Sequence, residues 1–258
     1  MDEIIIECSP GISGDMLMAA LYDLGVPQDV FEKPFIKLGL KDFFSLSFYE
    51  SQSCSLRGVK AEVNILKNNK EKKWKDIKKL ILSGSLDRDL ESMIIKVFEL
   101  LAIAEGRVHG VPTDEVHFHE IGRIDSLVDI IGVCAAIYYL KPKNIYCNAP
   151  TLGRGCINSE HGKIPIPSPV VLELLSSSQI NICSDCSIDE EISTPTGISL
   201  LLTLVNSFKS PSKYSIYSYG IGTGHKTFPF PNLLRVLKID VPKLKKVSFK
   251  NNPLFEEI

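Results

Sequence analysis

The spacing of apolar residues changes along the chain, and each spacing predicts a different element. Ile4 to Ile6 form a continuous apolar run, which is typical of a buried strand. A helical stripe of apolar residues follows, and Gly25 with Pro27 ends it. The stripe comprises Met16, Ala20, Leu21 and Leu24. The first thirty residues therefore predict a strand, a glycine-bearing loop and a helix.

The remaining sequence alternates between the two periods. Alternating residues between 44 and 66 predict a hairpin around Arg57 and Gly58. Helical spacing is found near 74–81, over 90–108 and over 124–140, and further helices are predicted from 169 and 197. Short strands are predicted near 145, 180, 216 and 236. We therefore expect an α/β fold, in which helices pack on a mixed sheet.

Composition favours one large domain. With 258 residues and 44% hydrophobic content, the chain can bury a sizeable core. We expect an α/β domain over residues 1–241 and a linker or tail over 242–258, because the sequence becomes basic and polar there. The lysines between 67 and 79 are interpreted as the solvated face of a helix, and a phosphate-binding role is the minority alternative.

Charge and targeting signals exclude several classes. The formal net charge of −2 gives no overall basic surface for nucleic acid. The longest apolar run, residues 130–140, is too short to cross a bilayer, and the N-terminus lacks the basic region of a signal peptide. A cytoplasmic protein that binds neither nucleic acid nor membrane is predicted. Its oligomeric state is left open, with a homo-oligomer among the alternatives.

The seven cysteines do not resemble the disulfide framework of a secreted protein, because their number is odd and their spacing irregular. Cys134 lies in an apolar helical run and is predicted to be a small core residue. Cys183 and Cys186 form a single Cys-x-x-Cys, without the second pair of a zinc ribbon. A surface loop is the favoured interpretation of that pair, and a metal or redox role is the alternative.

The clearest chemical signal lies between residues 116 and 129. His117 and His119 are two apart, so in an extended segment both imidazoles point the same way, with Glu120 beside them. Asp125 and Asp129 are four apart and share one helical face. Imidazole and carboxylate ligands suit nickel, zinc, copper and iron, so we predict a transition-metal site. Helix capping by the aspartates and a structural histidine are the alternatives.

Three glycine-bearing segments are candidates for anion binding. Gly11 to Asp15 join the first strand to the first helix, where Ser13 is the predicted N-cap and the backbone amides at the positive helix end suit a phosphate. Thr194, Thr196 and Gly197 open another helix in a similar way. Gly220, Gly222 and Gly224 follow a strand and allow close backbone approach to a ligand, or only a tight turn. None of these segments is a Walker A loop or a dinucleotide fingerprint.

Taken together, these segments resemble the LarC family of nickel insertion proteins. The resemblance rests on the ordered motifs Gly11–Met16, His117–Gly122 with Asp125 and Asp129, His161–Gly162, Thr194–Gly197, Gly220–Gly224 and Pro231–Asn232. It covers residues 3 to 240. Cys8 to Pro10 and Arg123 diverge from the family pattern, and Cys183 and Cys186 do not belong to it.

The resemblance implies CTP-dependent insertion of Ni(II) into pyridinium-3,5-bisthiocarboxylic acid mononucleotide, which forms the nickel-pincer cofactor of lactate racemase. In that product, two sulfurs and a ring carbon bind the metal. The expected partners are this precursor, a C-terminal domain of the same family and the lactate racemase apoprotein. CTP with Mg(II) or Mn(II) is expected to require that C-terminal domain, which the 258 residues do not include.

Our residue assignments follow from this chemistry. Asp15 and Glu120 are the candidate bases. The candidate cofactor-binding residues are Gly11, Ser13, Gly14, Thr194, Thr196, Gly197, Gly222 and Gly224, and the candidate metal ligands are His117, His119, Glu120, Asp125, Asp129 and His161. A non-catalytic nickel chaperone or storage module, a metal-dependent phosphohydrolase and an interaction module with structural histidines are the alternatives.

Overall fold

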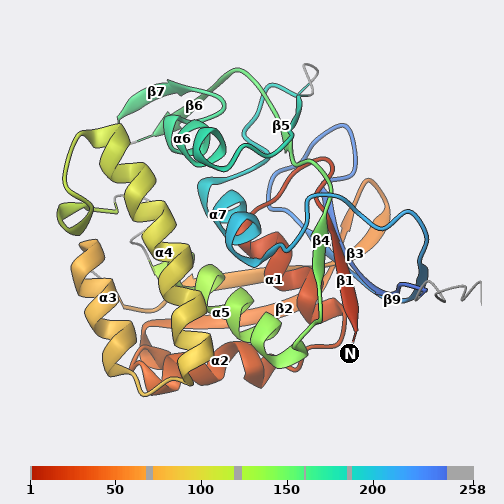
Figure 1. The fold of residues 1–258 in the computed structure, drawn as a ribbon, viewed down its shortest axis with the longest axis horizontal. Helices are drawn as coiled ribbons and strands as arrows, with labels where there is room; N and C mark the ends of the chain where they lie inside the picture. The colour runs from red at the N-terminus through yellow and green to blue at the C-terminus, as the bar shows by residue number, and fades with distance from the viewer. Residues whose placement is uncertain (1, 68–71, 119–123, 160, 185–187, 243–258) are drawn as a thin grey trace, which may run out of the picture.

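The protein folds around a mixed six-stranded sheet, as the sequence predicted. The computed structural model describes residues 2–67, 72–118, 124–159, 161–184 and 188–242 (Figure 1). From one edge to the other the sheet contains β2 (Phe44–Ser53), β3 (Leu56–Ile65), β9 (Ser215–Thr223), β10 (Leu233–Asp240), β1 (Glu3–Glu7) and β4 (Ile145–Cys147). β1 is antiparallel to β10 and parallel to β4.

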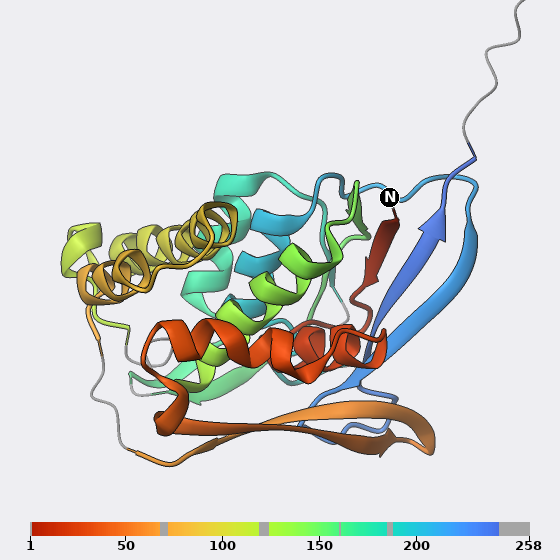
Figure 2. The ribbon, with the colours of Figure 1, turned by 90° about the horizontal axis from the view of Figure 1, so that it is seen from below.

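The helices gather on one face of this sheet, which Figure 2 shows from the side. They are α1 (Gly14–Asp23), α2 (Gln28–Lys37), α3 (Trp74–Ser83), α4 (Arg88–His109), α5 (Ile124–Leu140), α6 (Pro169–Ser178) and α7 (Pro195–Leu204). Period-two alternation in β1 explains the two sides. Ile4 and Ile6 belong to the main core beneath the helices, whereas Ile5 joins a small cluster with Leu237 and Ile239.

Most predicted elements are confirmed, and the caps explain their boundaries. In α4 the Asp87 side chain accepts a hydrogen bond from the Asp89 amide, and Gly110 ends the helix in the left-handed conformation. α5 spans the predicted residues and is buried along nearly its whole length. Cys134 lies in it with no exposed surface, and this confirms its prediction as a core residue.

Three details differ from the sequence prediction. α2 was missed, because Pro34 lies inside it and its apolar stripe is short. His161 lies at the turn of a hairpin formed by β6 (Cys156–Ser159) and β7 (Gly162–Pro165), two strands that the sequence pattern did not predict. The strand expected near 180 is β8 (Cys183–Ser184), which pairs with β5 (Thr151–Leu152). Cys183 is exposed in it, and Cys186 lies outside the described residues.

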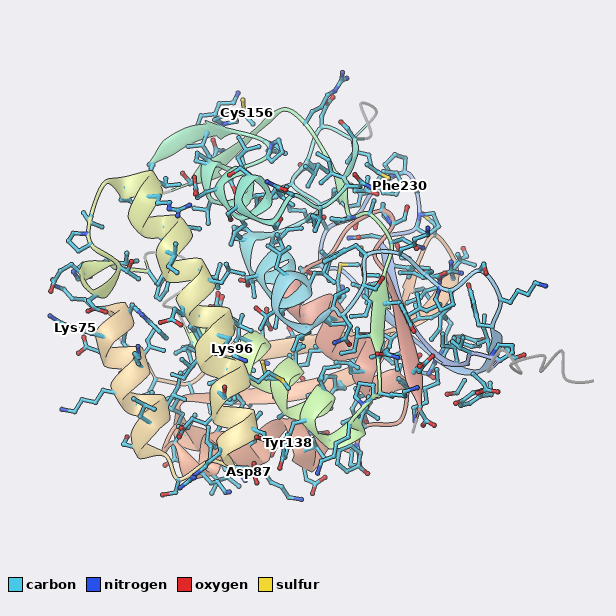
Figure 3. The ribbon with its side chains drawn as sticks, viewed as in Figure 1. Lys75, Asp87, Lys96, Tyr138, Cys156 and Phe230 are labelled. Carbon is cyan, nitrogen blue, oxygen red and sulfur yellow. The ribbon has the colours of Figure 1, made fainter. Side chains whose placement is uncertain are left out.

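The lysines before and within α3 form an ion-paired outer surface. Lys73 and Lys75 both contact Glu115 of the short 3-10 helix η2 (Thr113–Glu115), at 2.7 and 3.1 Å. These hydrogen bonds lower the pKa of the Glu115 carboxyl to about 2. Figure 3 shows Lys75 on the outer side of the molecule. The described lysines between 67 and 79 are exposed or half-buried, as expected for the solvated face of a helix.

Residues 243–258 of the predicted tail lie outside the described residues. None of the helices in the described residues combines the length and the apolar character needed to cross a bilayer.

Candidate functional site

Four helices direct their N-terminal ends into one cavity of about 870 Å³. The first turns of α1, α5, α6 and α7 line it, together with the last turns of α4 and the β6–β7 turn. We call it the four-helix cavity. Its volume is within the range of small-molecule sites. The N-terminal ends of helices carry partial positive charge, so this is a place where anionic groups are stabilised.

Three carboxylates from two helices meet in this cavity. Asp15 is in the first turn of α1, and Asp125 and Asp129 lie on the cavity side of α5. Burial raises the pKa of the Asp129 carboxyl well above its ordinary value, and the charges of Asp15 and Asp125 raise it further. A hydrogen bond from the backbone of Asp15 opposes part of this effect.

Gly14 makes the approach of the two helices possible. A β-carbon at this position would be 2.6 Å from Cβ of Asp129 and 2.7 Å from its carboxylate oxygen Oδ2. Atoms cannot approach that closely, so a side chain at residue 14 would displace the carboxylate. The glycine that the sequence assigned to a cofactor-binding loop therefore holds the space for Asp129.

The side chain of Asp15 is positioned from two directions. The Ser13 hydroxyl donates a short hydrogen bond to it and does not cap α1, which was the role predicted for Ser13. Nε2 of His225 is 3.4 Å from the other oxygen of Asp15 and 3.2 Å from the carbonyl oxygen of Ala61. The loop that follows the glycine-rich strand therefore brings an imidazole to the candidate base.

The predicted metal ligands are only partly brought together. Asp125, Asp129 and His161 line the four-helix cavity, where the ring of His161 lies 4.9 Å from that of His109. His109 in turn is 3.2 Å from the Glu105 carboxylate, one helical turn earlier in α4. Within the described part of the chain, no group of three or more His, Cys, Asp or Glu side chains has the geometry of a metal site.

His117 does not line the four-helix cavity, whereas the sequence grouped it with Asp125 and Asp129 as candidate metal ligands. Its neighbours Val116 and Phe118 are buried, and Phe118 packs beside Trp74 and Phe98 in the core. Because side chains alternate in an extended segment, His117 is exposed, in an antiparallel bridge with Lys73. His119 and Glu120 lie outside the described residues, so their predicted roles stay predictions.

The glycines of the candidate phosphate loops approach protein backbone. The backbone of Ile12 pairs with the segment before α7, with hydrogen bonds of 2.8 and 2.9 Å to Ile192 and Thr194. Gly11 is packed against the Ile192 carbonyl and Gly197 against the carbonyl of Ile12. These two glycines therefore join the loop before α1 to the start of α7.

The ligand-binding role predicted for Gly222 and Gly224 stays a prediction, and the structure shows which protein atoms lie beside each glycine. A side chain at Gly222 would collide with the Met16 carbonyl of α1, and one at Gly224 would collide with the Asn232 side chain. Neither glycine lines the four-helix cavity. Both glycines permit a close approach within the protein, Gly222 to α1 and Gly224 to the loop that contains Asn232.

The cavity also contains residues that the sequence reasoning missed. Glu105, His109, Ser168 and Glu191 line it, and His225 contacts Asp15. The spacing of Glu105 and His109, four apart near a helix end, was a usable signal. Thr196 and Thr194, which the sequence assigned to cofactor binding, line the cavity, and the Thr194 hydroxyl caps α7 by accepting from the Gly197 amide at 3.1 Å.

Comparison with known proteins identifies the family. The sequence matches the family described as nickel insertion protein over residues 4–253. It is 36% identical over 237 residues to the pyridinium-3,5-bisthiocarboxylic acid mononucleotide nickel insertion protein of Staphylococcus epidermidis. The aligned region covers 92% of this chain and 59% of that protein. It is 34% identical over 260 residues to the protein of the same name from Clostridium kluyveri, covering 96% and 64%.

The chain thus spans about three fifths of the length of these curated relatives. No solved structure matches it. The family match extends over nearly all of the described fold and includes every residue of the four-helix cavity. The chain belongs to the nickel insertion protein family.

Proposed function

We propose that this chain takes part in the insertion of Ni(II) into pyridinium-3,5-bisthiocarboxylic acid mononucleotide, and that the four-helix cavity is where the substrates meet. The observation that carries this proposal is the convergence of Asp15, Asp125 and Asp129 in one cavity. Carboxylates that repel one another attract a divalent cation, because the cation neutralises that repulsion. The two curated relatives are named for this reaction.

Nickel is a substrate of this reaction, and we assign its entry position to Asp125 and Asp129. His161 lines the same cavity and remains a candidate for an additional ligand. Imidazole and carboxylate groups both bind nickel. The sulfur atoms of the precursor would replace these protein ligands as the metal is transferred.

Forming the nickel–carbon bond also requires a base. The ring carbon keeps the electron pair of its C–H bond for the metal, so a proton has to leave. We assign Asp15 as the proton acceptor, because its carboxylate lies in the cavity and is held by the Ser13 hydroxyl. Nε2 of His225 faces both the Asp15 carboxylate, at 3.4 Å, and the Ala61 carbonyl, at 3.2 Å, so it carries a hydrogen and we assign it to positioning Asp15.

The CTP dependence implied by the family belongs to the same proposal. We infer that CTP, with Mg(II) or Mn(II), acts together with the portion of the longer relatives that lies beyond the matched region. The nickel-pincer product would then be delivered to lactate racemase. Adding that portion of a relative as a separate polypeptide, with and without CTP, tests this division of labour.

The central experiment is anaerobic incubation of this chain with Ni(II) and the metal-free precursor. CTP and the remaining portion of a longer relative, added as a separate polypeptide, are also present. Nickel-containing product is measured by mass spectrometry, and nickel binding by calorimetry. Asp125→Asn should weaken nickel binding by roughly tenfold or more, as loss of metal-site groups commonly does. Asp76→Asn is the matched control, because Asp76 is also an exposed carboxylate in the first turn of a helix.

Two outcomes would contradict the proposal. Equal nickel binding by the Asp125→Asn and Asp76→Asn variants would show that Asp125 of the cavity does not bind the metal. Nickel binding without binding of the precursor would favour a chaperone or storage module. His117→Ala provides a further comparison, and a larger effect of this variant than of Asp125→Asn would place the metal near the exposed histidine.

A further inference from the structure

The N-terminal ends that meet in the four-helix cavity differ in what already occupies them. At α1 the first turn carries Asp15, whose backbone donates to the Asp129 carboxylate. The first turn of α5 carries Asp125. At α7 the Thr194 hydroxyl accepts the Gly197 amide. Carboxylates or a capping side chain therefore already satisfy part of the positive potential at these three helices.

The N-terminal end of α6 is different. Its first turn contains no acidic residue, and its N-cap residue, Ser168, makes no capping hydrogen bond. Pro169 follows, so the first amide available to an acceptor belongs to Val170. The unpaired amides of a first helical turn need an acceptor from outside the helix. At α6 the capping side chain does not provide one.

The Ser168 hydroxyl provides an independent observation. Only 6% of the residue is exposed, and its Oγ atom is buried without any hydrogen-bond partner in the described part of the protein. Ser168, Pro169 and Val170 all line the four-helix cavity. Burying a hydroxyl without a partner costs free energy, so such a group is expected to meet a partner that arrives with a ligand.

We propose that the N-terminal end of α6 is the phosphate-binding end of the four-helix cavity, where the Ser168 hydroxyl and the first-turn amides of α6 donate to the phosphate of the pyridinium mononucleotide. This inference rests on the proposed function, which supplies the ligand. It assigns the phosphate to a helix that the sequence did not single out, in place of the loops at Gly11 and Thr194.

The charges in the cavity support this orientation. A phosphate at the start of α1 or α5 would face Asp15, Asp125 and Asp129, and like charges repel. At α6 it would meet a helix end without a carboxylate in its first turn. The carboxylates then remain for the metal. The cavity would hold the mononucleotide with its phosphate at α6 and its reacting ring towards α1 and α5.

Binding of stable probes without nickel tests this assignment. Nicotinic acid mononucleotide and nicotinic acid riboside share the pyridinium ring and sugar and differ only in the phosphate. The wild-type chain should bind the mononucleotide more tightly than the riboside in calorimetry. Ser168→Ala should weaken mononucleotide binding about tenfold, as expected for loss of a hydrogen bond to a charged group, and leave riboside binding unchanged.

Two further variants keep the test decisive. Ser168→Asp retains a good N-cap residue, so the helix should fold, but its negative charge should abolish the preference for the mononucleotide. Ser176→Ala is the matched control, because Ser176 is exposed in the same helix and its hydroxyl only donates to the Glu173 carbonyl. This control should bind both probes as the wild type does.

The assignment would be overturned if Ser168→Ala and Ser168→Asp both bound the mononucleotide normally, or if they weakened both probes equally. A further arm uses CMP, because a cytidine nucleotide also carries phosphate. If the Ser168 variants lost CMP binding and kept mononucleotide binding, the α6 end would bind a cytidine nucleotide, and the assignment would be wrong. Since no arm contains nickel, a chain that passes these tests and never forms the nickel product would contradict the proposed function alone.

Discussion

At the scale of single residues, helix packing changes the pKa of one carboxylate of the cavity. The side chain of Asp129 in α5 packs against Gly14 of α1. Burial there and the charges of Asp15 and Asp125 raise its pKa. Its ionised form is therefore disfavoured in the folded protein relative to the unfolded chain. The stability linked to this group is present at low pH and is lost as the pH rises through the raised pKa.

This linkage predicts a pH-dependent effect of Asp129→Asn. The variant cannot ionise, so metal-free protein should melt at a higher temperature than the wild type near pH 8. The difference should shrink towards about pH 4, near the unperturbed value of an aspartate. Thermal unfolding at both pH values measures it, and Asp76→Asn should show a smaller change between them. A wild type that is more stable than the Asn variant at pH 8 would contradict the interpretation.

A second residue-scale prediction concerns Gly14→Ala. The new methyl group would overlap the Asp129 side chain, so we expect a loss of about 1–3 kcal/mol in stability and a clear loss of nickel binding. Gly39→Ala is the control. Gly39 has a positive φ of 67° and no atoms near its β-position, so alanine there should cost stability and leave nickel binding intact. Normal nickel affinity in a folded Gly14→Ala protein would show that Asp129 is not needed.

At the scale of elements, the contact between α1 and β9 positions the cavity. Gly220 and Gly222 let the strand lie directly against the helix backbone near Ala20 and Met16. The start of α1 is held by a second backbone contact, in which Ile12 pairs with the segment before α7. The Asp15 carboxylate is thus fixed by the packing of whole elements as well as by its own hydrogen bonds.

Gly222→Ala tests this packing. Its β-carbon would collide with the Met16 carbonyl, which belongs to a helix and cannot move freely. We expect a loss of about 3 kcal/mol in the free energy of unfolding without any ligand present, at the upper end of ordinary overpacking costs. Chemical denaturation measures it. A fully stable variant with weakened mononucleotide binding would instead restore the ligand-contact role that the sequence suggested.

At the scale of the whole molecule, nickel binding to the native cavity should appear as added stability. A ligand that binds only the folded state at 100 times its Kd contributes about 2.7 kcal/mol. The melting temperature of the wild type should therefore rise with Ni(II) and return to its starting value when EDTA is added. Asp125→Asn should respond less, and Asp76→Asn should respond like the wild type. A rise that is equal in all three would indicate a metal site elsewhere.

The sequence alone determined most of the elements and the family. Apolar periodicity is a local property, so β1, α1, α4 and α5 could be predicted from neighbouring residues. The ordered motifs pointed to nickel insertion proteins for a similar reason, since a motif is read along the chain. Asp15, Asp125 and Asp129 all belong to such motifs, and the structure places them in one cavity.

Only the tertiary structure decided which candidates meet. His117 and Asp125 are close in sequence, yet the packing of Val116 and Phe118 into the core leaves His117 exposed away from the cavity. Ser168 belongs to no recognisable sequence motif. What distinguishes it is a buried hydroxyl without a partner at the start of a helix, and only the structure shows this. Burial and long-range contacts depend on how distant elements pack together, so they cannot be predicted from a residue's neighbours in the sequence.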